Sequence, residues 1–305
     1  MSKKIILIAG PTASGKSSLA LLLAKKINGE IVNADSMQVY NEFSVLSSRP
    51  NNKDLKTVKH HIYAIISVKK NFSTGKWLNL IKKKIKDIIK RKKIPILVGG
   101  TGLYFTAITK GISKIPSINN KTRLKLRNLH KKIGQKEFYK KLVKIDPISK
   151  NRISSNDTQR TLRAYEVKLS TKKSLYDWAS NTKSDFLNYE LKKIFLDIPR
   201  DVLLKNIKER TNQMFERDCV KEVKNFLKLN INKSLSANKI IGVSEITHYL
   251  SGLNSIDRTK ELINIKTRQY AKRQKTWCRG HMKNWNMLYY EDKSVLLKKV
   301  LKLTS

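Results

Sequence analysis

A glycine-rich segment near the start of the sequence constrains the fold more than any other feature. Residues 10–17 read Gly-Pro-Thr-Ala-Ser-Gly-Lys-Ser, between an apolar run at 5–9 and a helix-favouring run at 18–24. This order of strand, glycine-rich turn and helix is the context of a phosphate-binding P-loop. Backbone N–H groups of such a loop surround phosphate oxygens, and the N-terminus of the following helix adds positive charge. The segment therefore predicts a site for a diphosphate or a polyphosphate.

Two side chains of this loop have predicted chemical roles. We expect Lys16 to place a positive charge beside the phosphates and Ser17 to offer its hydroxyl to a Mg²⁺ ion bound with them. An incidental glycine-rich turn is the alternative, and the agreement of the loop with both flanks argues against it. The loop residues predicted to bind the diphosphate are Gly10, Thr12, Ala13, Ser14, Gly15, Lys16 and Ser17.

Further apolar runs predict a parallel α/β sheet. Runs at 30–34 and 94–98 are separated by a segment whose apolar residues, between Leu78 and Ile89, recur at helical spacing. Strand-helix-strand alternation predicts βαβ units, and ligands of such sheets bind at the carboxyl ends of the strands. Three segments are therefore expected to meet in one crevice, namely 10–17, 35–40 and 99–104.

The sequence changes character near residue 115. A Lys/Arg-rich block that follows is predicted to be helical at 122–133, 136–143 and 157–169, a strand returns at 194–198, and helices continue at 200–217, 220–229, 244–250 and 261–279. The predicted fold class is α/β, with a kinase-like P-loop core, a helical insertion and C-terminal helices. The predicted boundaries are 1–115 for the first part of the core, 116–195 for the insertion and 196–305 for the remainder.

Charge is the strongest compositional signal. Lysine and arginine number 65 against 23 acidic residues, a net charge of +42 that attracts polyanions such as nucleic acid. AT-rich genomes also enrich lysine, asparagine and isoleucine, which leaves a purely compositional origin open. No run approaches ~18 apolar residues, and the P-loop stands where a signal peptide would lie. We therefore expect a cytoplasmic protein without membrane spans, and a monomer, with two unpaired cysteines.

Asp35 and Thr101 are the candidate catalytic side chains. Asp35 follows the second predicted strand, where a carboxylate facing the phosphates can accept a proton from an attacking nucleophile. An Asx turn or a helix cap is the alternative. The strand at 94–98 ends in Gly-Gly-Thr-Gly, without the carboxylate that motor ATPases place at a strand end to hold Mg²⁺. This pattern favours a kinase-like or transferase-like site, in which Thr101 offers a hydroxyl. The alternative is that Gly-Gly-Thr-Gly forms only a tight turn.

The adjacent histidines His60 and His61 do not predict a metal site. Neighbouring residues of a strand point to opposite faces, and no third ligand has the spacing of a zinc site. We expect one of the two to be buried and the other exposed.

Basic residues recur at helical spacing in two places. Arg160 and Arg163 share one face of the segment that follows Asn156-Asp157. A longer set forms a one-sided cationic stripe suited to a phosphate backbone, and a solvated face is the alternative. The residues of this stripe, which we predict to contact RNA, are Arg268, Lys272, Lys275 and Arg279.

These segments together resemble the bacterial tRNA dimethylallyltransferases. The resemblance runs in order from the first strand to the helix that contains the stripe, and it rests on residues 10–17, 33–40, 60–61, 95–104, 156–164 and 267–277. It implies a P-loop fold with a helical insertion that contacts the anticodon stem-loop. It also implies transfer of a dimethylallyl group from dimethylallyl diphosphate, with Mg²⁺, to N6 of the adenosine 3′ of the anticodon.

The resemblance assigns further roles. By position, Asp35 matches the family's base, and Arg210 matches an arginine that faces the diphosphate. Its implied tRNA contacts are Asp35, Ser36, Met37, Gln38, Thr101, Arg123, Gln159, Arg160, Thr161, Leu162 and Arg163. The chain departs from the family at residues 42–50, which read Glu-Phe-Ser-Val-Leu-Ser-Ser-Arg-Pro where Gly-Leu-Asp-Ile-Gly-Thr-Ala-Lys-Pro is usual, and at Asn206, where arginine is frequent.

The chemistry is consistent with this interpretation. A diphosphate leaving group needs its developing charge stabilised, and an amine inside a stacked anticodon loop has to be flipped out before it can react. Two other function classes stay open at this point. One is a small-molecule or nucleoside kinase with ATP in the loop, which the cationic stripe disfavours. The other is an RNA-binding ATP switch, which the missing strand-end carboxylate disfavours.

Overall fold

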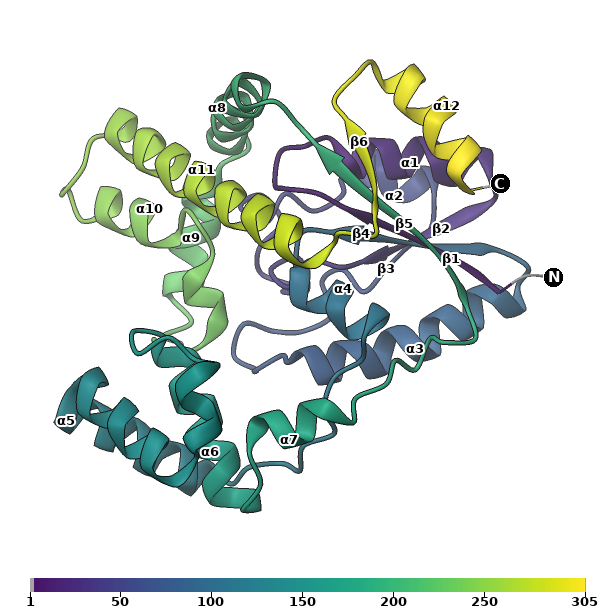
Figure 1. The fold of residues 1–305 in the computed structure, drawn as a ribbon. Helices are drawn as coiled ribbons and strands as arrows, with labels where there is room; N and C mark the ends of the chain where they lie inside the picture. Colours follow the sequence, from purple (N-terminus) through teal and green to yellow (C-terminus); the bar gives the residue numbers. More distant parts are fainter. Residues whose placement is uncertain (1–2, 305) are drawn as a thin grey trace. The chain divides into compact units, whose positions relative to one another are not determined.

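The apolar runs form a six-stranded sheet in the computed structural model, which describes residues 3–304 (Figure 1). The strand order is β3-β2-β4-β1-β5-β6, and all five neighbouring pairs are parallel. The predicted parallel α/β sheet is therefore confirmed. The strands are β1 (Lys4–Ala9), β2 (Gly29–Asn33), β3 (His60–His61), β4 (Ile94–Gly99), β5 (Glu190–Asp197) and β6 (Asn286–Tyr289).

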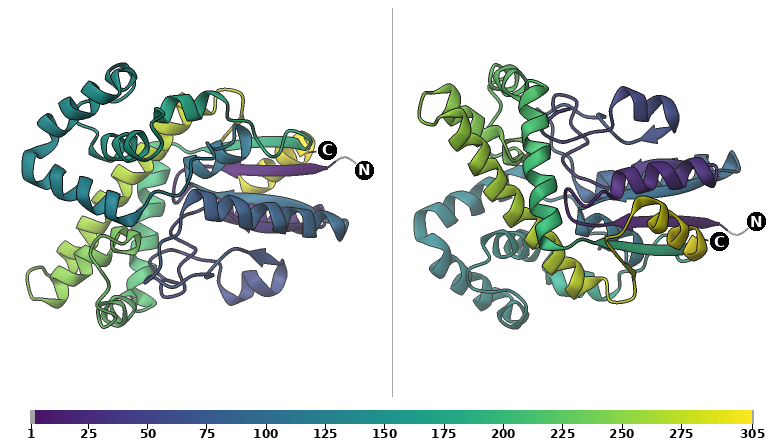
Figure 2. Two further views of the ribbon diagram at one scale, coloured as in Figure 1. Left: turned by 90° about the horizontal axis from the view of Figure 1, so that it is seen from below. Right: turned by 90° about the horizontal axis from the view of Figure 1, so that it is seen from above.

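Helices cover both faces of this sheet. α1 (Lys16–Lys26) and α12 (Lys293–Thr304) lie on one face, and α3 (Thr74–Lys90) and α4 (Gly102–Thr109) on the other (Figure 2). Strands buried from two sides are apolar along their length, which is why β1, β2 and β4 could be recognised as continuous apolar runs. The helical spacing in α3 is confirmed, because four of the residues it marks are buried, namely Leu78, Ile81, Ile85 and Ile88, while Ile89 is partly buried.

Four further helices gather where the strands end. They are α8 (Arg200–Glu216), α9 (Cys219–Leu227), α10 (Val243–Leu250) and α11 (Ile256–His281). Their apolar faces form a core separate from that of the sheet, and the segment after β2 joins it through Val39, Tyr40 and Phe43. A short helix, α2 (Asn52–Thr57), and a 3₁₀ turn, Ser236–Lys239, complete this part of the chain. The segment that follows β2 is thereby held against helices that come 150 or more residues later.

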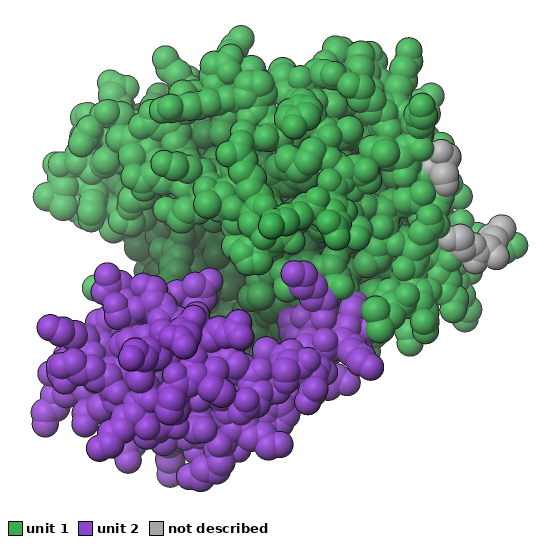
Figure 3. Space-filling model, in the orientation of Figure 1, with its two compact units in different colours: residues 1–109, 186–305 green, residues 110–185 purple. Residues whose placement is uncertain are grey.

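Residues 110–185 form a compact unit of their own, distinct from residues 1–109 and 186–305 (Figure 3). It contains α5 (Asn120–Ile145), a 3₁₀ turn (Pro147–Asn151), α6 (Thr158–Thr171) and α7 (Leu175–Ser180). The two helices predicted at 122–133 and 136–143 are the two halves of α5, which are separated at Gly134, whose φ of 73° interrupts the helical backbone. Leu126, Phe138, Leu142 and Tyr165 form the small core of this unit.

The structure differs from the sequence-based expectation at several places. The helical unit ends at residue 185 where 195 was expected, and β5 begins at Glu190, four residues before the predicted strand at 194–198. The first half of β5 is polar and only partly buried, so it carries no apolar signal. The sequence analysis also missed β6, three of whose four residues are exposed, and α12. The helix that carries the cationic stripe is therefore not the last one.

Gly99 offers a direct test of this architecture. A Cβ added at Gly99 would lie 2.0 Å from the carbonyl oxygen of Ala34, a backbone atom just after β2. We expect Gly99→Ala to lower the free energy of unfolding by about 3 kcal/mol, because neither backbone can move aside cheaply. Urea denaturation followed by circular dichroism measures this change. The matched control is Gly280→Ala in α11, where a Cβ meets no atom within 4 Å and little loss is expected. Equal stabilities of the two variants would contradict the packing of β2 against β4.

Candidate active site

The glycine-rich segment forms a loop between β1 and α1, as the sequence predicts. β1 ends at Ala9, α1 begins at Lys16, and Gly15 precedes the helix with a φ of 82°, which an L-residue rarely adopts. Lys16 extends back over the loop, and its Nζ donates a hydrogen bond to the carbonyl of Pro11 at 3.0 Å. The Ser14 hydroxyl is buried and has no hydrogen-bond partner among the described residues. The loop thus holds a cation and a buried hydroxyl, both of which an anion can engage.

Helix α8 adds a second cation to this loop. Arg210 donates from its guanidinium to Thr12 Oγ1 at 2.7 Å, and Asn206 Nδ2 donates to the carbonyl of Ala13 at 3.0 Å. Asn206, which stands where the related family often has arginine, therefore supports the loop through its backbone. Arg210, which the resemblance predicts to face the diphosphate, thus reaches the P-loop across nearly 200 residues of sequence.

Burial lowers the pKa of both cations, Lys16 and Arg210. Burial lowers the pKa of Lys16 to about 8; the nearby charge of Asp35 opposes this shift, while that of Arg210 adds to it. Burial also lowers the pKa of Arg210, again against the opposing charge of Asp35. A pair of partly desolvated cations has a strong electrostatic preference for an anion between them. Two buried cations at the P-loop end of β1 therefore give this place an electrostatic preference for an anion.

Asp35 lies just after β2, half-buried beside these cations. Its Oδ1 accepts a hydrogen bond from the backbone of Met37 at 2.8 Å, so the Asx turn weighed as an alternative is present. The turn occupies one carboxylate oxygen and is compatible with a chemical role of the other. Burial raises the pKa of Tyr104 and of Tyr270, and the charge of Asp35 raises it further. The carboxyl group of Asp35 therefore lies near two cations and two phenols whose pKa values are raised.

Thr101 holds the neighbouring segment in place. Its Oγ1 accepts a hydrogen bond from the backbone of Ser36 at 3.0 Å and donates to Ser36 Oγ at 3.3 Å. The hydroxyl predicted to be catalytic therefore donates its hydrogen to Ser36. In this structure Thr101 supports the 35–38 segment. The predicted convergence of three strand ends is confirmed here, because 99–102 contacts both the end of β2 and, through α11, the P-loop.

Gln274 of α11 makes that last connection, and the sequence analysis did not single it out. Its Oε1 accepts from the backbone of Thr12 at 2.8 Å, and its Nε2 donates to the carbonyl of Gly100 at 2.9 Å. A Cβ at Gly100 would lie 2.1 Å from this Nε2, and one at Gly102 would enter the ring of Trp277. The glycines of the Gly-Gly-Thr-Gly turn therefore leave room for side chains of α11, and not only for a ligand. A glutamine within a helical run carries no local signal of such a bridge.

Ser17 is the residue predicted to help hold a divalent cation. It is exposed in the first turn of α1, next to Lys16. No group of three or more His, Cys, Asp or Glu side chains within residues 3–304 is arranged to hold a metal ion. This donor set fits Mg²⁺, which keeps several waters and binds mainly through substrate phosphates, and it does not fit a protein cage. The two adjacent histidines are structural: buried His61 contacts Glu30 at 2.6 Å, and half-buried His60 bonds the carbonyl of Val58.

The cationic stripe lines a groove between α8 and α11. A cavity of about 440 Å³ is lined by all four stripe residues together with Arg200, and Leu203 and Leu204 form part of its wall. Lys275 differs from the rest of the stripe, because it is half-buried and its Nζ lies 2.6 Å from Asp197 Oδ1 at the end of β5. Its charge is therefore compensated inside the protein. Arg268, Lys272 and Arg279 are exposed and present their charge to solvent.

The predicted RNA contacts of the helical unit lie on α5 and α6. Arg123 and Arg163 both lie 3.8 Å from Glu166, so they share one buried carboxylate. Arg160 is exposed beside Asp157, its N-cap residue, and Gln159 is exposed as well. Thr161 is fully buried and bonds the carbonyl of Asp157. The side chain of Thr161 thus supports α6 from inside, contrary to the expected contact with RNA.

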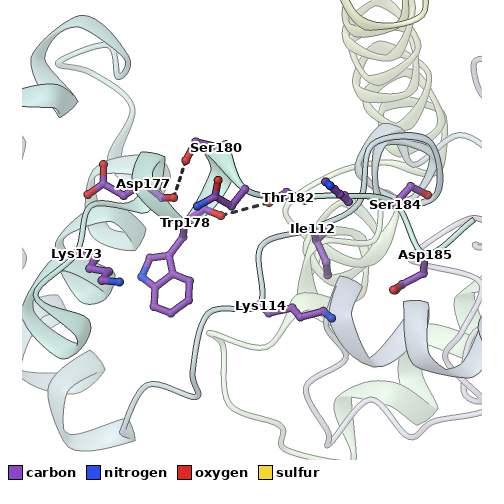
Figure 4. A pocket seen from close by; sticks show the side chains of 11 residues that line it. Ile112, Lys114, Lys173, Asp177, Trp178, Ser180, Thr182, Ser184 and Asp185 are labelled. Atoms are coloured by element: carbon purple, nitrogen blue, oxygen red, sulfur yellow. Dashed lines mark hydrogen bonds between the residues drawn. The ribbon is translucent and has the colours of Figure 1, made fainter. Parts of the chain in front are cut away.

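The same unit contains a cavity of about 660 Å³ beside α7 (Figure 4). Trp178 and Lys173 border it, with the Lys173 Nζ 5.7 Å from the centre of the indole ring. Three lysines and two aspartates line the cavity, so no single charge dominates it, and we assign it no ligand.

Comparisons with known proteins give a consistent result. The model of the family described as "IPP transferase" matches residues 38–281. The chain is 54% identical over 282 residues to the tRNA dimethylallyltransferase of Pelagibacter ubique (strain HTCC1062), covering 92% of this chain and 90% of that relative. Its fold resembles that of the full-length tRNA isopentenylpyrophosphate transferase of Bacillus halodurans, with a TM-score of 0.70, 28% identity and coverage of 99% and 97% of the two chains. A eukaryotic dimethylallyltransferase acting on tRNA gives a TM-score of 0.82 at 26% identity, over 96% of this chain and 75% of that one.

The lowered pKa of Lys16 predicts how diphosphate binding depends on pH. A bound anion stabilises the protonated amine, so the complex has the higher pKa, and affinity present below pH 8 is lost as pH rises above about 8. We expect the loss to approach about tenfold per pH unit for one linked proton. Calorimetric titration with inorganic diphosphate, at pH 7 to 9.5, measures it. In Lys16→Arg the side chain stays protonated over this pH range. Diphosphate itself titrates equally in both experiments, so the difference in pH dependence between the two proteins is due to Lys16. Parallel pH profiles would show that Lys16 does not contact the anion.

Proposed function

The chain belongs to the IPP transferase family of tRNA dimethylallyltransferases, and on this premise we propose its reaction in detail. It transfers a dimethylallyl group to tRNA. The donor is dimethylallyl diphosphate, the acceptor is N6 of the adenosine on the 3′ side of the anticodon, and the second product is diphosphate.

One observation carries this proposal. Asp35, just after β2, lies near both Lys16 of the P-loop and Arg210 of α8, whose guanidinium bonds Thr12 Oγ1 at 2.7 Å. An anionic group beside a cationic phosphate site is what a transfer to a weak amine nucleophile requires, since one group takes a proton while the other receives a negative leaving group. The same arrangement of P-loop and Asp35 would suit a kinase, and the family membership favours the prenyl donor.

The transfer is a displacement at the first carbon of the dimethylallyl group. A bond forms between this carbon and N6, while the bond from the carbon to the diphosphate oxygen breaks. Lys16, Arg210 and the loop N–H groups stabilise the negative charge that develops on the diphosphate. Asp35 orients the amine and accepts the proton that N6 releases. Thr101 keeps the 35–38 segment at the correct distance through its bonds to Ser36.

A divalent cation completes the diphosphate site in this proposal. The hydroxyl of Ser17 and the phosphates of the donor would hold Mg²⁺, which would supply charge neutralisation for the leaving group. The remaining loop residues named above contribute backbone donors and shape.

The tRNA is bound by its anticodon stem-loop. An adenine stacked in that loop is out of reach of a crevice, so the base has to be turned out before it can meet Asp35. We propose that Ser36, Met37 and Gln38 contact the loop, and that the exposed stripe residues bind its phosphates. Contacts on the helical unit come from Arg123, Gln159, Arg160, Leu162 and Arg163, and the buried Thr161 is not among them. No helix within residues 3–304 is long and apolar enough to cross a bilayer, and we propose a cytoplasmic monomer as the working form.

Substitution of Asp35 tests its chemical role. Asp35→Asn keeps the shape and the acceptor for Met37 but loses the negative charge and the proton acceptor. We expect the single-turnover rate with dimethylallyl diphosphate and an anticodon stem-loop to fall about 10²–10⁴-fold. Binding of the stem-loop should stay within a few-fold of wild type. Asp201→Asn, at an exposed position of α8, is the control. A defect in stem-loop affinity with an unchanged rate would assign Asp35 to positioning instead.

Binding of RNA phosphates in the groove between α8 and α11 can be tested separately. Replacing Arg268, Lys272 and Arg279 by Gln should make the slope of log affinity against log salt shallower by about 2–3, at roughly 0.7–0.9 per lost phosphate contact. The control replaces Lys83, Lys86 and Lys90, exposed on α3, by Gln with the same change in net charge. Titrations of a stem-loop at several salt concentrations compare the two. Equal slopes for both triple variants would show that the groove is only a solvated face.

A further inference from the structure

Glu222 of α9 binds the backbone of a loop that lies 176–178 residues earlier in the sequence. Its Oε1 accepts from the N–H groups of Ser44 at 2.6 Å and Val45 at 2.8 Å, and also from the Ser44 hydroxyl at 3.0 Å. Its Oε2 accepts from the N–H of Leu46 at 2.9 Å. One carboxylate thus satisfies three successive backbone donors. Such a charge-assisted set fixes the path of a loop that has no regular secondary structure.

The loop that Glu222 holds is closed by its own hydrogen bonds. Ser48 donates from its backbone to the carbonyl of Val45 at 3.0 Å, and Ser47 Oγ donates to the carbonyl of Phe43 at 2.7 Å. Ser48 has a φ of 52°, in the left-handed region that non-glycine residues adopt only when their surroundings impose it. The carbonyls of Ser47 and Ser48 are consequently fixed on one side of the loop.

Those two carbonyls hold the side chain of Gln38. Gln38 Nε2 donates to Ser47 O at 2.9 Å and to Ser48 O at 3.1 Å. Two carbonyl acceptors determine which end of the amide carries nitrogen, and they engage both of its hydrogens. The side-chain oxygen of Gln38 is left as the group that can bond to a ligand. Gln38 is half-buried and lies three residues after Asp35.

We propose that Glu222 is a positioning residue that, through residues 44–48, fixes Gln38 as a one-sided hydrogen-bond acceptor for an N–H donor of an RNA base. This inference rests on the proposed function. A fixed acceptor binds an exocyclic amine or ring N–H of an unstacked base and disfavours phosphate oxygens, which are themselves acceptors. It therefore supplies base selectivity next to Asp35, where the cationic groove supplies only general attraction.

The first test is whether Glu222 acts through Gln38. Glu222→Gln leaves one former acceptor position with an N–H₂ group facing a backbone donor, so the loop should loosen. We expect the Kd for an anticodon stem-loop, measured without the diphosphate substrate, to rise about tenfold, as for loss of a charged hydrogen-bond acceptor. Gln38→Ala should raise it similarly. In the Gln38→Ala background, Glu222→Gln should add less than about twofold, because coupled residues are not additive. If the Kd of the double variant instead rises by the product of the two single effects, the proposal is overturned.

Two further measurements separate positioning from general destabilisation. Hydrogen exchange of the Ser44, Val45 and Leu46 amides should quicken in Glu222→Gln and stay slow in Gln38→Ala, and unchanged exchange in Glu222→Gln would overturn the role of the carboxylate. Glu216→Gln, an exposed glutamate at the end of α8, is the control and should change neither exchange nor affinity.

The third measurement tests the nature of the ligand group. A stem-loop with 2′-deoxyribose throughout its loop should still lose affinity with Gln38→Ala, because the donor is a base; disappearance of the effect would overturn that assignment. Since affinity and exchange are measured without prenyl transfer, failure of the transfer reaction itself would be seen separately, as an inactive wild-type protein.

Discussion

The carboxamide of Gln274 joins the three parts of the molecule on which the site depends. Its oxygen binds the P-loop at Thr12 and its nitrogen binds the turn after β4 at Gly100, across 262 and 174 residues of sequence. Both partners are backbone groups at the carboxyl edge of a parallel sheet, where ligands of such sheets bind. The bridge fixes the helix α11 against this edge, and the groove that carries the stripe follows from its position. A buried amide with both ends bonded leaves little freedom for the loop to move independently.

Local patterns accounted for much of the fold and for part of the site. The P-loop, the apolar strands and α3 were predictable because their signals lie within a few neighbouring residues. The contacts of Gln274 and Glu222 were not predictable, because each is a polar side chain whose role depends on a partner more than 170 residues away. β6 was missed because a short, mostly exposed strand has no apolar period. Thr161 was misplaced because the resemblance assigned a whole segment, while a helix turns one of its residues inward.

The large positive charge has two different uses in this molecule. Some cations are committed inside the protein, as Lys275 is to Asp197 and as Arg91 is to the buried carboxylate of Glu30. The latter pairing is strong enough, with the hydrogen bond from His61, to outweigh burial and lower the pKa of Glu30 to about 2. Others, such as Arg268 and Arg279, remain exposed around one groove. A net charge of +42 therefore overstates the number of groups available to RNA, and the arrangement of the exposed ones is more informative than their sum.

The central claim is that the P-loop serves prenyl transfer to tRNA and not phosphoryl transfer. The most direct measurement incubates the purified protein and Mg²⁺ with an unmodified tRNA transcript and either dimethylallyl diphosphate or ATP, then digests the RNA to nucleosides for mass spectrometry. The account predicts adenosine carrying one dimethylallyl group with the first donor only, mapped next to the anticodon. A phosphorylated product with ATP, and unmodified adenosine with dimethylallyl diphosphate, would contradict it.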